Sequence, residues 1–335
     1  MKILVTGGGG FLGQTICKQL VAAGHDVCAF NRNRYAALDA LKVEQRVGDI
    51  ANLDSVTTAA EGVDAIVHSA GKVGAWGRLE DFYEANVRGT DNVLAACELH
   101  KIGKLVFTSS PSVVHDGGDL DGVDESAPYA RHFSSAYAQT KALAEQRVLA
   151  ANGAQIATVA LRPHFVWGPG DPNLIPRILK QARAGRLRLI GDKPKKIDAT
   201  FVDNAAEAHV LALDKLGIGS AIAGKVYFIS QDEPVTHEAL INSWLKADGF
   251  PPETRRLPLG LAQFVGAALE AIYGGLRIQR EPPLTRFVVE QLSTAHWFNI
   301  SAARRDLGYA PRVSMAEGLA RLSQYLARER MQRRG

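Results

Sequence analysis

The stretch KILVTGGGGFLG, residues 2–13, joins a run of apolar residues to a cluster of five glycines. Apolar residues before the glycines predict a buried strand, and apolar residues at helical spacing after them predict a helix. Gly7, Gly10 and Gly13 are spaced as G-x-x-G-x-x-G between the two. The first glycine permits a tight bend, the second lets a pyrophosphate approach the backbone, and the third allows close packing of helix on strand. We therefore predict a dinucleotide-binding turn, with a plain strand-to-helix turn as the alternative.

Similar apolar runs recur along the chain, and most of them alternate with helical patterns. Hydrophobic strands that alternate with helices predict a parallel sheet covered on both faces. We therefore expect a doubly wound, Rossmann-like α/β fold that binds its ligands at the carboxyl ends of the strands. The predicted later strands are HDVCAF (25–30), VEQRVGD (43–49), DAIVHSA (64–70), KLVFTSS (104–110), ATVALRP (157–163) and KVYFIS (225–230).

The pattern also divides the chain into two parts. Residues 1–168 are expected to form the dinucleotide-binding Rossmann-like core, and residues 196–232 are expected to return to it. Residues 169–195 and 233–335 are expected to form a smaller, mostly helical C-terminal lobe that binds the substrate.

Composition excludes several classes of protein. The 335 residues carry a net charge of +4, and no basic run is interleaved with aromatic residues, so we predict no nucleic-acid partner. Cys17, Cys28 and Cys97 lack CxxC spacing, and no pair of histidines has ligand spacing, so we predict neither a disulfide framework nor a metal site. The first residues form no secretory leader, and no apolar run reaches about 18 residues. We therefore expect a cytoplasmic protein.

An apolar stripe lies in the predicted lobe. Apolar residues recur at helical spacing from Leu257 to Ile272. Such a stripe favours packing in the core. A lipophilic substrate channel or a contact with a membrane surface is the alternative.

The end of the second predicted strand indicates which dinucleotide is bound. A carboxylate there would bind the adenosine ribose and repel a 2′-phosphate. This chain has Asn31 at that position, followed by Arg32. Because a guanidinium pairs well with a phosphate, we predict NADP(H), with a solvated arginine as the alternative.

Three residues predict proton-transfer chemistry. Tyr137 and Lys141 are spaced i and i+4, which places them on the same face of a predicted helix. A nearby ammonium favours the ionised phenol, so we expect Lys141 to lower the pKa of Tyr137. Serines follow the strand KLVFTSS, where a hydroxyl can donate to a developing oxyanion.

In combination, the glycine turn, the strand-end serine and the YxxxK pair resemble the extended short-chain dehydrogenase/reductase superfamily. The resemblance implies Ser110, Tyr137 and Lys141 as the catalytic residues, with Ser112 as the second choice for the serine. It also implies that Asn86, in EANVRGT, corresponds to an asparagine that the family carries on a helix. The cofactor-binding residues that it implies are Gly7, Gly10, Phe11, Leu12, Gly13, Arg32, Asp49, Ile50, Ser69, Ala70, Tyr137, Lys141, Pro163 and Val166.

Later segments narrow the resemblance. FVDNAAEAHVLAL (201–213) and the stretch from Glu281 to Arg321 are similar to the 3β-hydroxysteroid dehydrogenase branch. Among bacterial members of that branch, general similarity favours the 2-alkyl-3-oxoalkanoate reductases of olefin biosynthesis. This resemblance implies reduction of a lipophilic keto acid to a hydroxy acid by NADP(H). We also expect a homodimer, with a membrane surface or a pathway enzyme as a further contact.

Three other functions stay open. The first is a 3β-hydroxysteroid dehydrogenase, and the second is an NADP-sensing protein without chemistry. The third is a sugar-nucleotide epimerase, although Val114 and His115 stand where many such enzymes carry Tyr-Gly. An epimerase needs basic groups for a second diphosphate, and the candidates are Arg177, Arg183 and Arg186.

Overall fold

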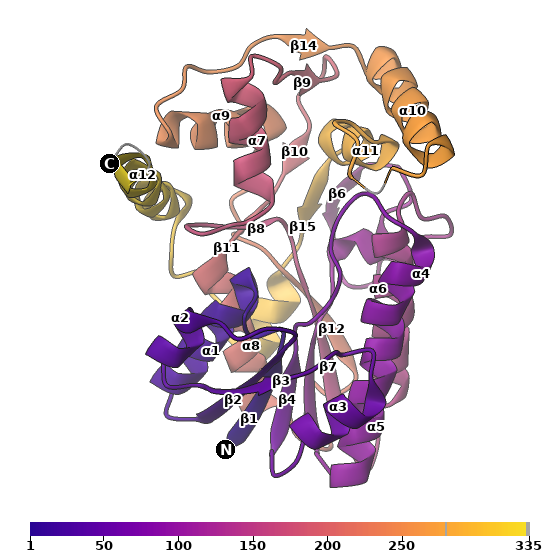
Figure 1. Ribbon diagram of the computed structural model, residues 1–335, viewed down its shortest axis with the longest axis vertical. Helices are drawn as coiled ribbons and strands as arrows, with labels where there is room; N and C mark the ends of the chain where they lie inside the picture. Colours follow the sequence, from indigo (N-terminus) through magenta and orange to yellow (C-terminus); the bar gives the residue numbers. More distant parts are fainter. Residues whose placement is uncertain (279, 333–335) are drawn as a thin grey trace.

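A parallel sheet of seven strands forms the larger part of the computed structural model, which describes residues 1–278 and 280–332 (Figure 1). The strand order is β12-β7-β5-β4-β1-β2-β3, and every neighbouring pair is parallel. The predicted doubly wound fold is therefore confirmed. The strands are β1 (Lys2–Thr6), β2 (Asp26–Asn31), β3 (Glu44–Val47), β4 (Ala65–His68), β5 (Lys104–Thr108), β7 (Ala157–Pro163) and β12 (Lys225–Ile229).

Helices cover both faces of this sheet because successive side chains of each strand point to opposite faces. Ile3 and Val5 join a buried cluster with Ile16 of α1, whereas Leu4 joins a separate cluster with Val93 of α5. One face is covered by α1 (Phe11–Ala22) and α8 (Val202–Lys215). The other face is covered by α3 (Leu53–Ala59), α5 (Gly89–His100) and α6 (Ala136–Ala150).

Short segments at the edges of this core complete the larger part. They are α2 (Ala36–Ala40), α4 (Leu79–Tyr83), the π-helical turn η1 (Glu84–Arg88), the 3₁₀ turn η2 (Pro111–Val114) and the π-helical turn η3 (Ala303–Leu307). The last of these comes from late in the chain, yet Ala303 and Leu307 are buried in the same cluster as Ile3.

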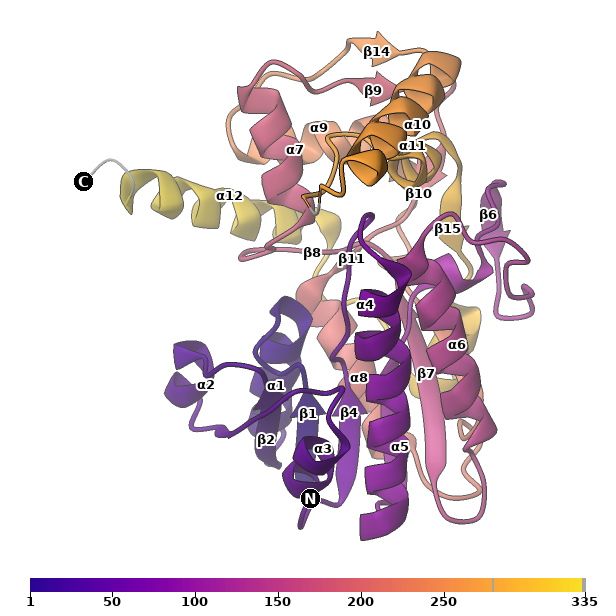
Figure 2. The same ribbon diagram turned by 45° about the vertical axis from the view of Figure 1, so that its right-hand side comes forward.

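A smaller lobe sits above the carboxyl ends of the strands (Figures 1 and 2). Its helices are α7 (Leu174–Arg183), α9 (His237–Ala247), α10 (Leu259–Gly275), α11 (Arg286–Ser293) and α12 (Met315–Gln332). It also contains a four-stranded sheet of β13 (Val235–Thr236), β10 (Lys196–Ile197), β15 (His296–Phe298) and β6 (Leu120–Val123). Two further strand pairs are β11 (Thr200–Phe201) with β8 (Val166–Trp167) and β14 (Arg256–Leu257) with β9 (Leu189–Ile190).

The chain crosses between the two parts more often than the sequence pattern indicated. β6 lies within the predicted core segment 1–168 but pairs with β15 in the small lobe. β12 lies in the large sheet, whereas β10, from the same predicted returning segment 196–232, pairs in the small one. Positions 279 and 333–335 of the predicted lobe segment 233–335 lie outside the described residues.

The prediction that the apolar stripe of α10 packs in the core is wrong, because most of the stripe lies at the surface. Ala262 and Gly266 are the buried residues of this helix. A Cβ atom on Gly266 would lie 3.2 Å from the backbone nitrogen of Arg286, so α10 packs on α11 through its small residues. None of its large apolar residues is buried, and four of them are exposed: Leu259, Leu261, Phe264 and Ile272. None of the described helices is both long enough and apolar enough to span a bilayer.

A buried ion pair fixes α6 to the sheet. Arg162 of β7 donates from Nε to Glu145 Oε2 at 3.0 Å, and the two side chains are 3% and 0% exposed. The Tyr129 hydroxyl donates to Glu145 Oε1 at 2.7 Å. The Nη1 atom of Arg162 has no partner among the described residues, so the guanidinium depends on Glu145 for its charge balance.

Glu145→Gln should lower the free energy of unfolding by about 3–5 kcal/mol, because it leaves the buried Arg162 charge uncompensated. Urea denaturation followed by circular dichroism measures this. The matched control is Glu84→Gln, which breaks the exposed Glu84–Arg88 pair and should cost no more than about 0.5 kcal/mol. Equal stability of the two variants would contradict a structural role for the buried pair.

Candidate active site

The glycine turn brings the ends of β1 and β4 into close contact. Gly7 has φ +72°, and a Cβ atom on it would lie 2.8 Å from Ala70 Cα. A Cβ atom on Gly13 would lie 2.1 Å from the carbonyl oxygen of Gly7, so no side chain fits there. The amide of Gly10 donates to the same carbonyl at 2.9 Å. The turn thus presents the amino end of α1 where the strand order reverses, which is where such folds bind ligands.

Phe11 and Leu12 begin α1, and both are half-buried against apolar residues of the small lobe. Their side chains therefore contribute to the packing between the lobe and the turn. The backbone of this first helical turn is what lies nearest to the glycines.

Polar contacts hold the end of β4 beside this turn. The Thr6 hydroxyl lies 2.7 Å from Nδ1 of His68 and accepts the amide of Ala70 at 3.2 Å. His68 Nε2 lies 3.1 Å from the Thr90 hydroxyl. Burial lowers the pKa of His68 to about 3, so the ring is neutral and links three elements. Ser69 follows at the half-buried edge of the sheet.

The end of β2 carries the residues predicted to select the dinucleotide. Asn31 is buried, and its Oδ1 accepts the amide of Gly9 at 2.7 Å. Its Nδ2 is a buried donor that has no partner among the described residues. Arg32 is exposed, and no ion pair or hydrogen bond joins its guanidinium to the described residues, whereas Arg34 pairs with Asp39 at 3.4 Å. An orphaned amide donor and a free guanidinium fit a phosphorylated ribose.

Two of the predicted cofactor-binding residues, Asp49 and Ile50, lie just after β3. Asp49 is exposed, and its Oδ1 accepts the amide of Ala51 at 3.0 Å. Ile50 is buried, and a Cβ atom on Gly89 would lie 2.9 Å from its Cγ1. Asp49 therefore faces solvent at the rim, while Ile50 packs against the start of α5.

Tyr137 and Lys141 lie one turn apart near the start of α6, which Ser135 caps by accepting the amide of Ala138 at 3.2 Å. The Lys141 ammonium donates to the carbonyl oxygen of Thr108 and lies 4.0 Å from the centroid of the Phe107 ring. Burial lowers the pKa of Lys141 to about 7, and nearby Glu145 opposes this shift. The lysine side chain is thus held at the end of β5, one helical turn after Tyr137 on α6.

The phenol of Tyr137 meets Ser110. Burial raises the pKa of Tyr137, and a hydrogen bond with the Ser110 hydroxyl opposes the shift. The prediction that Lys141 lowers this pKa is wrong for this structure, because desolvation of the phenolate dominates and the ammonium points to the Thr108 carbonyl. Ser112 contacts Ser110 at 3.0 Å between hydroxyl oxygens, so it supports the serine that lies beside the phenol.

Asn86 joins the segment after β4 to α6. Its Oδ1 accepts the amide of Lys72 at 2.7 Å, and its Nδ2 donates to the Lys72 carbonyl at 3.1 Å and to Thr140 Oγ1 at 3.0 Å. The residue lies in the π-helical turn η1, a rare geometry that often marks functional sites. One buried amide thus sets the distance between the cofactor edge of the sheet and the helix of Tyr137.

The chain leaves the sheet at the end of β7. Pro163 pairs with Ile229 in the large sheet, and Val166 pairs with Thr200 in a short ladder. Phe165 between them has φ +36°, which is an unfavourable conformation for a non-glycine residue. The backbone from 163 to 166 therefore turns sharply from the core into the small lobe.

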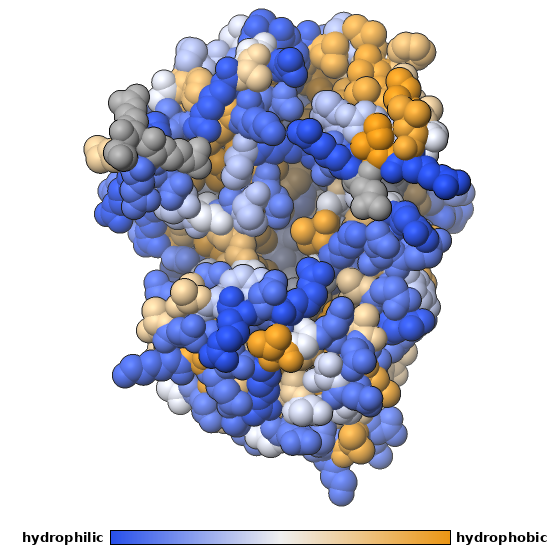
Figure 3. Space-filling model, viewed as in Figure 1, coloured by the Kyte–Doolittle hydropathy of each residue, from blue (hydrophilic) through white to orange (hydrophobic). Residues whose placement is uncertain are grey.

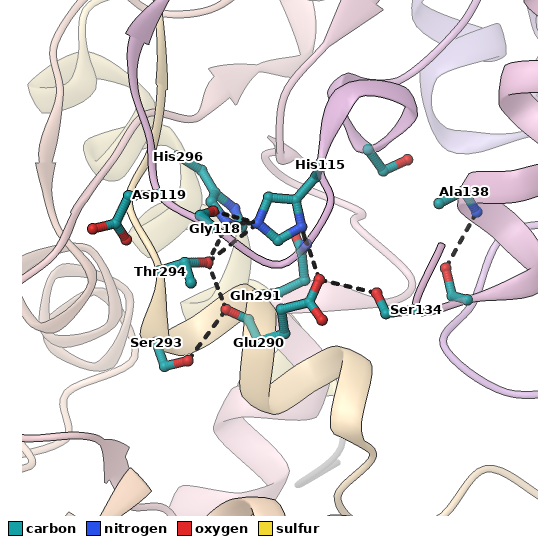
Figure 4. A network of polar contacts seen from close by, with 12 residues as sticks. His115, Gly118, Asp119, Ser134, Ala138, Glu290, Gln291, Ser293, Thr294 and His296 are labelled. Atoms are coloured by element: carbon teal, nitrogen blue, oxygen red, sulfur yellow. Dashed lines mark hydrogen bonds and ion pairs between the residues drawn. The ribbon is translucent and has the colours of Figure 1, made fainter. Parts of the chain in front are cut away.

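Sequence reasoning missed a polar network that joins the small lobe to the start of α6 (Figure 4). Glu290 of α11 accepts the Ser134 hydroxyl at 3.0 Å, and its Oε1 lies 2.8 Å from His115 Nδ1. His115 Nε2 lies 3.0 Å from His296 Nε2 and 3.0 Å from the carbonyl oxygen of Gly118. These residues are far apart in the sequence, and no local spacing indicates that they meet.

A second link between the two parts is made by Trp76. Trp76, in the loop between β4 and α4, donates from Nε1 to the carbonyl oxygen of Ile278 at 3.2 Å. Its ring also meets Tyr273 edge-on, with centroids 6.5 Å apart. Figure 2 shows this loop rising from the sheet to the small lobe.

Two of the arginines considered for a second diphosphate are engaged elsewhere. Arg177 pairs with Glu281, and Arg183 pairs with Asp248 at 2.6 Å. Arg186 is exposed.

Comparison with known proteins agrees with the resemblance found in the sequence. Residues 4–259 match the model of the 3-beta hydroxysteroid dehydrogenase/isomerase family. The 2-alkyl-3-oxoalkanoate reductase of Stenotrophomonas maltophilia is 53% identical over 96% of this chain and 98% of its own length. The enzyme of the same name from Shewanella oneidensis is 49% identical over 95% of this chain and 84% of its own.

Among solved structures, the UDP-glucuronic acid 4-epimerase of Bacillus cereus in complex with NAD has a TM-score of 0.76. It is 24% identical and covers 98% of this chain and 99% of its own, so it shares the fold. The chain therefore belongs to the 3-beta hydroxysteroid dehydrogenase/isomerase family, and it is an oxidoreductase that acts with a nicotinamide cofactor on a small-molecule alcohol or ketone.

Proposed function

We propose that this oxidoreductase uses NADP(H) to reduce the ketone of a lipophilic 2-alkyl-3-oxoalkanoic acid to the 3-hydroxy acid. The observation that carries the proposal is the 53% identity, over nearly the full length of both chains, to a reductase of that name. The contact between Ser110 and Tyr137 supports an enzyme rather than a nucleotide sensor, because a sensor needs no proton donor.

The cofactor would lie along the carboxyl edge of the sheet, and when bound it supplies the hydride. The turn from Gly7 to Gly13 would hold the pyrophosphate through backbone amides at the start of α1. Asn31 Nδ2 would donate to the ribose or its phosphate, and Arg32 would pair with a 2′-phosphate. The absence of a carboxylate at position 31 supports NADP(H) over NAD(H).

Tyr137 would donate the proton. Its raised pKa keeps the hydroxyl protonated at neutral pH, as a donor to the ketone oxygen must be. Ser110 would hydrogen-bond the same oxygen as negative charge develops on it. Lys141 would bind the cofactor's ribose, because its ammonium is held at the end of β5 beside the tyrosine.

The sugar-nucleotide alternative has less support. Arg177 and Arg183 already pair with carboxylates, so a second diphosphate would have to displace Glu281 and Asp248. His115 in turn lies between Glu290 and His296. A lipophilic acid has no diphosphate, so its binding does not require these ion pairs to break.

Tyr137→Phe should lower kcat by about 10²- to 10⁴-fold and leave NADPH affinity nearly unchanged, because only the proton donor is lost. Steady-state turnover and fluorescence titration of NADPH measure the two quantities. Tyr83→Phe is the control, since that hydroxyl contacts Arg147 on the surface. A Tyr137→Phe enzyme with normal turnover would remove this residue from the mechanism.

Arg32→Ala should reduce the preference for NADPH over NADH in kcat/KM by roughly ten- to hundred-fold, the value of a charged hydrogen-bonded pair. Arg34→Ala is the matched control, because Arg34 lies two residues away and already pairs with Asp39. The ratio of kcat/KM for the two cofactors is measured for each protein. A wild-type enzyme that prefers NADH would contradict the proposed role of the β2 end.

Lengthening the alkyl arms of the substrate should raise kcat/KM several-fold per carbon until the site is full, because each buried methylene contributes about 0.8 kcal/mol. A series of 2-alkyl-3-keto acids, or the hydroxy acids in reverse, tests this. 3-Ketosteroids and UDP-sugars are assayed beside them. Activity that ignores chain length, or that occurs only with steroids or UDP-sugars, would overturn the proposed substrate.

A further inference from the structure

The outward face of α10 is apolar along its whole length (Figure 3, upper right). Phe264 is 70% exposed and Leu276, just after the helix, is 69% exposed. Ile272 lies between them and is 53% exposed, and Leu261, one turn before Phe264, is 50% exposed. A helix on the surface of a globular protein normally turns charged residues to water. Contiguous exposed apolar residues of this kind mark a contact surface.

The helix itself offers no free charge on this face. Its one charged residue, Glu270, pairs with Arg286 at the start of α11 at 2.6 Å. Between Leu261 and Ile272 the other exposed residues are the small Ala267 and Ala271 and one polar residue, Gln263. The surface therefore consists of Leu261, Phe264, Ile272 and Leu276 on a background of alanine and glycine, and we call it the α10 face.

Uncompensated positive charge lies at the carboxyl end of the α10 face, whereas Arg255 and Arg256 before the helix pair with Glu253 and Glu238. Between Thr254 and Arg286 the chain carries five arginines and two glutamates. Both glutamates are paired, since Glu281 contacts Arg177 and Glu270 contacts Arg286. Arg277 and Arg280 follow the helix directly, and within the described residues neither forms an ion pair or a hydrogen bond through its side chain.

The charges favour a bilayer over a second copy of the chain. A two-fold contact would place the same face of each copy against the other. In a parallel arrangement Arg277 and Arg280 would meet their own counterparts. In an antiparallel one they would meet Arg255 and Arg256, whose charges Glu253 and Glu238 already balance. Unbalanced like charges would face each other in the parallel case, and the antiparallel contact would offer Arg277 and Arg280 no free carboxylate. Anionic lipid headgroups, by contrast, complement both of these arginines.

We propose that α10 lies flat on the surface of an anionic phospholipid bilayer, with its apolar face in the interface and with Arg277 and Arg280 among the headgroups. The helix does not span the bilayer, because its 17 residues are too few for that. The proposal is independent of the substrate, since it rests on the exposure and charge of residues outside the catalytic set.

Sedimentation with phospholipid vesicles tests the proposal on the full-length protein. The wild type should co-sediment with vesicles that contain phosphatidylglycerol, less with pure phosphatidylcholine, and less again as salt is raised. Leu261→Ser/Phe264→Ser should weaken binding at least roughly ten-fold, because two exposed apolar side chains no longer enter the interface. Arg277→Ala/Arg280→Ala should remove most of the preference for phosphatidylglycerol.

Leu99→Ser is the matched control, because Leu99 on α5 is 65% exposed but lies outside the α10 face. It should bind vesicles like the wild type, and all variants should keep normal turnover of a water-soluble substrate and normal thermal unfolding. If the serine double variant does not fold, the arginine double variant still tests the proposal.

Wild-type protein that stays in the supernatant with phosphatidylglycerol vesicles at low salt would overturn the proposal, and so would equal loss of binding in Leu99→Ser. Analytical ultracentrifugation tests the alternative, in which a second copy of the chain covers the α10 face. The homodimer expected from the resemblance stays a prediction, and a dimer that Leu261→Ser/Phe264→Ser converts to a monomer would assign the α10 face to a second copy instead.

Discussion

The rest of the structure depends on the close approach of two backbone segments at Gly13 and Gly7. A Cβ atom at Gly13 would lie 2.1 Å from the carbonyl oxygen of Gly7, so α1 can rest on the end of β1 only where that side chain is absent. This contact places a helix amino end at the point where the strand order reverses. Because all seven strands are parallel, the ends of β2, β4, β5 and β7 reach the same edge. The positions predicted for the cofactor, the serine and the tyrosine therefore lie at one edge of the sheet.

Local patterns predicted much of this arrangement because the relevant distances are local. The spacing of Gly7, Gly10 and Gly13 determines a single turn, and the spacing of Tyr137 and Lys141 determines one face of α6. The alternation of strands and helices likewise predicted the parallel sheet, since it leaves few other ways to bury apolar strands.

Features that depend on the tertiary environment could not be predicted in this way. Glu290 meets His115 and Ser134 across more than 150 positions of sequence, and no spacing indicates that contact. The apolar stripe of α10 was visible, but its exposure depends on Gly266 bringing the backbone of α11 close. The direction of the Tyr137 pKa shift depends on burial, which outweighs any effect expected from the neighbouring lysine. Similarity of fold to sugar-nucleotide epimerases does not predict the reaction either, because function depends on the side chains of the site rather than on the sheet that carries them.

The bridge made by Trp76 has an optical consequence. Two of the four tryptophans, Trp167 and Trp244, lie in the dry interior of the small lobe, where their surroundings change little unless the protein unfolds. Trp76 instead belongs to the core but contacts Ile278 and Tyr273 of the small lobe. Any separation of the two parts would expose its indole to water and shift its emission to longer wavelength. The emission wavelength of Trp76 should therefore report whether the core and the small lobe stay in contact.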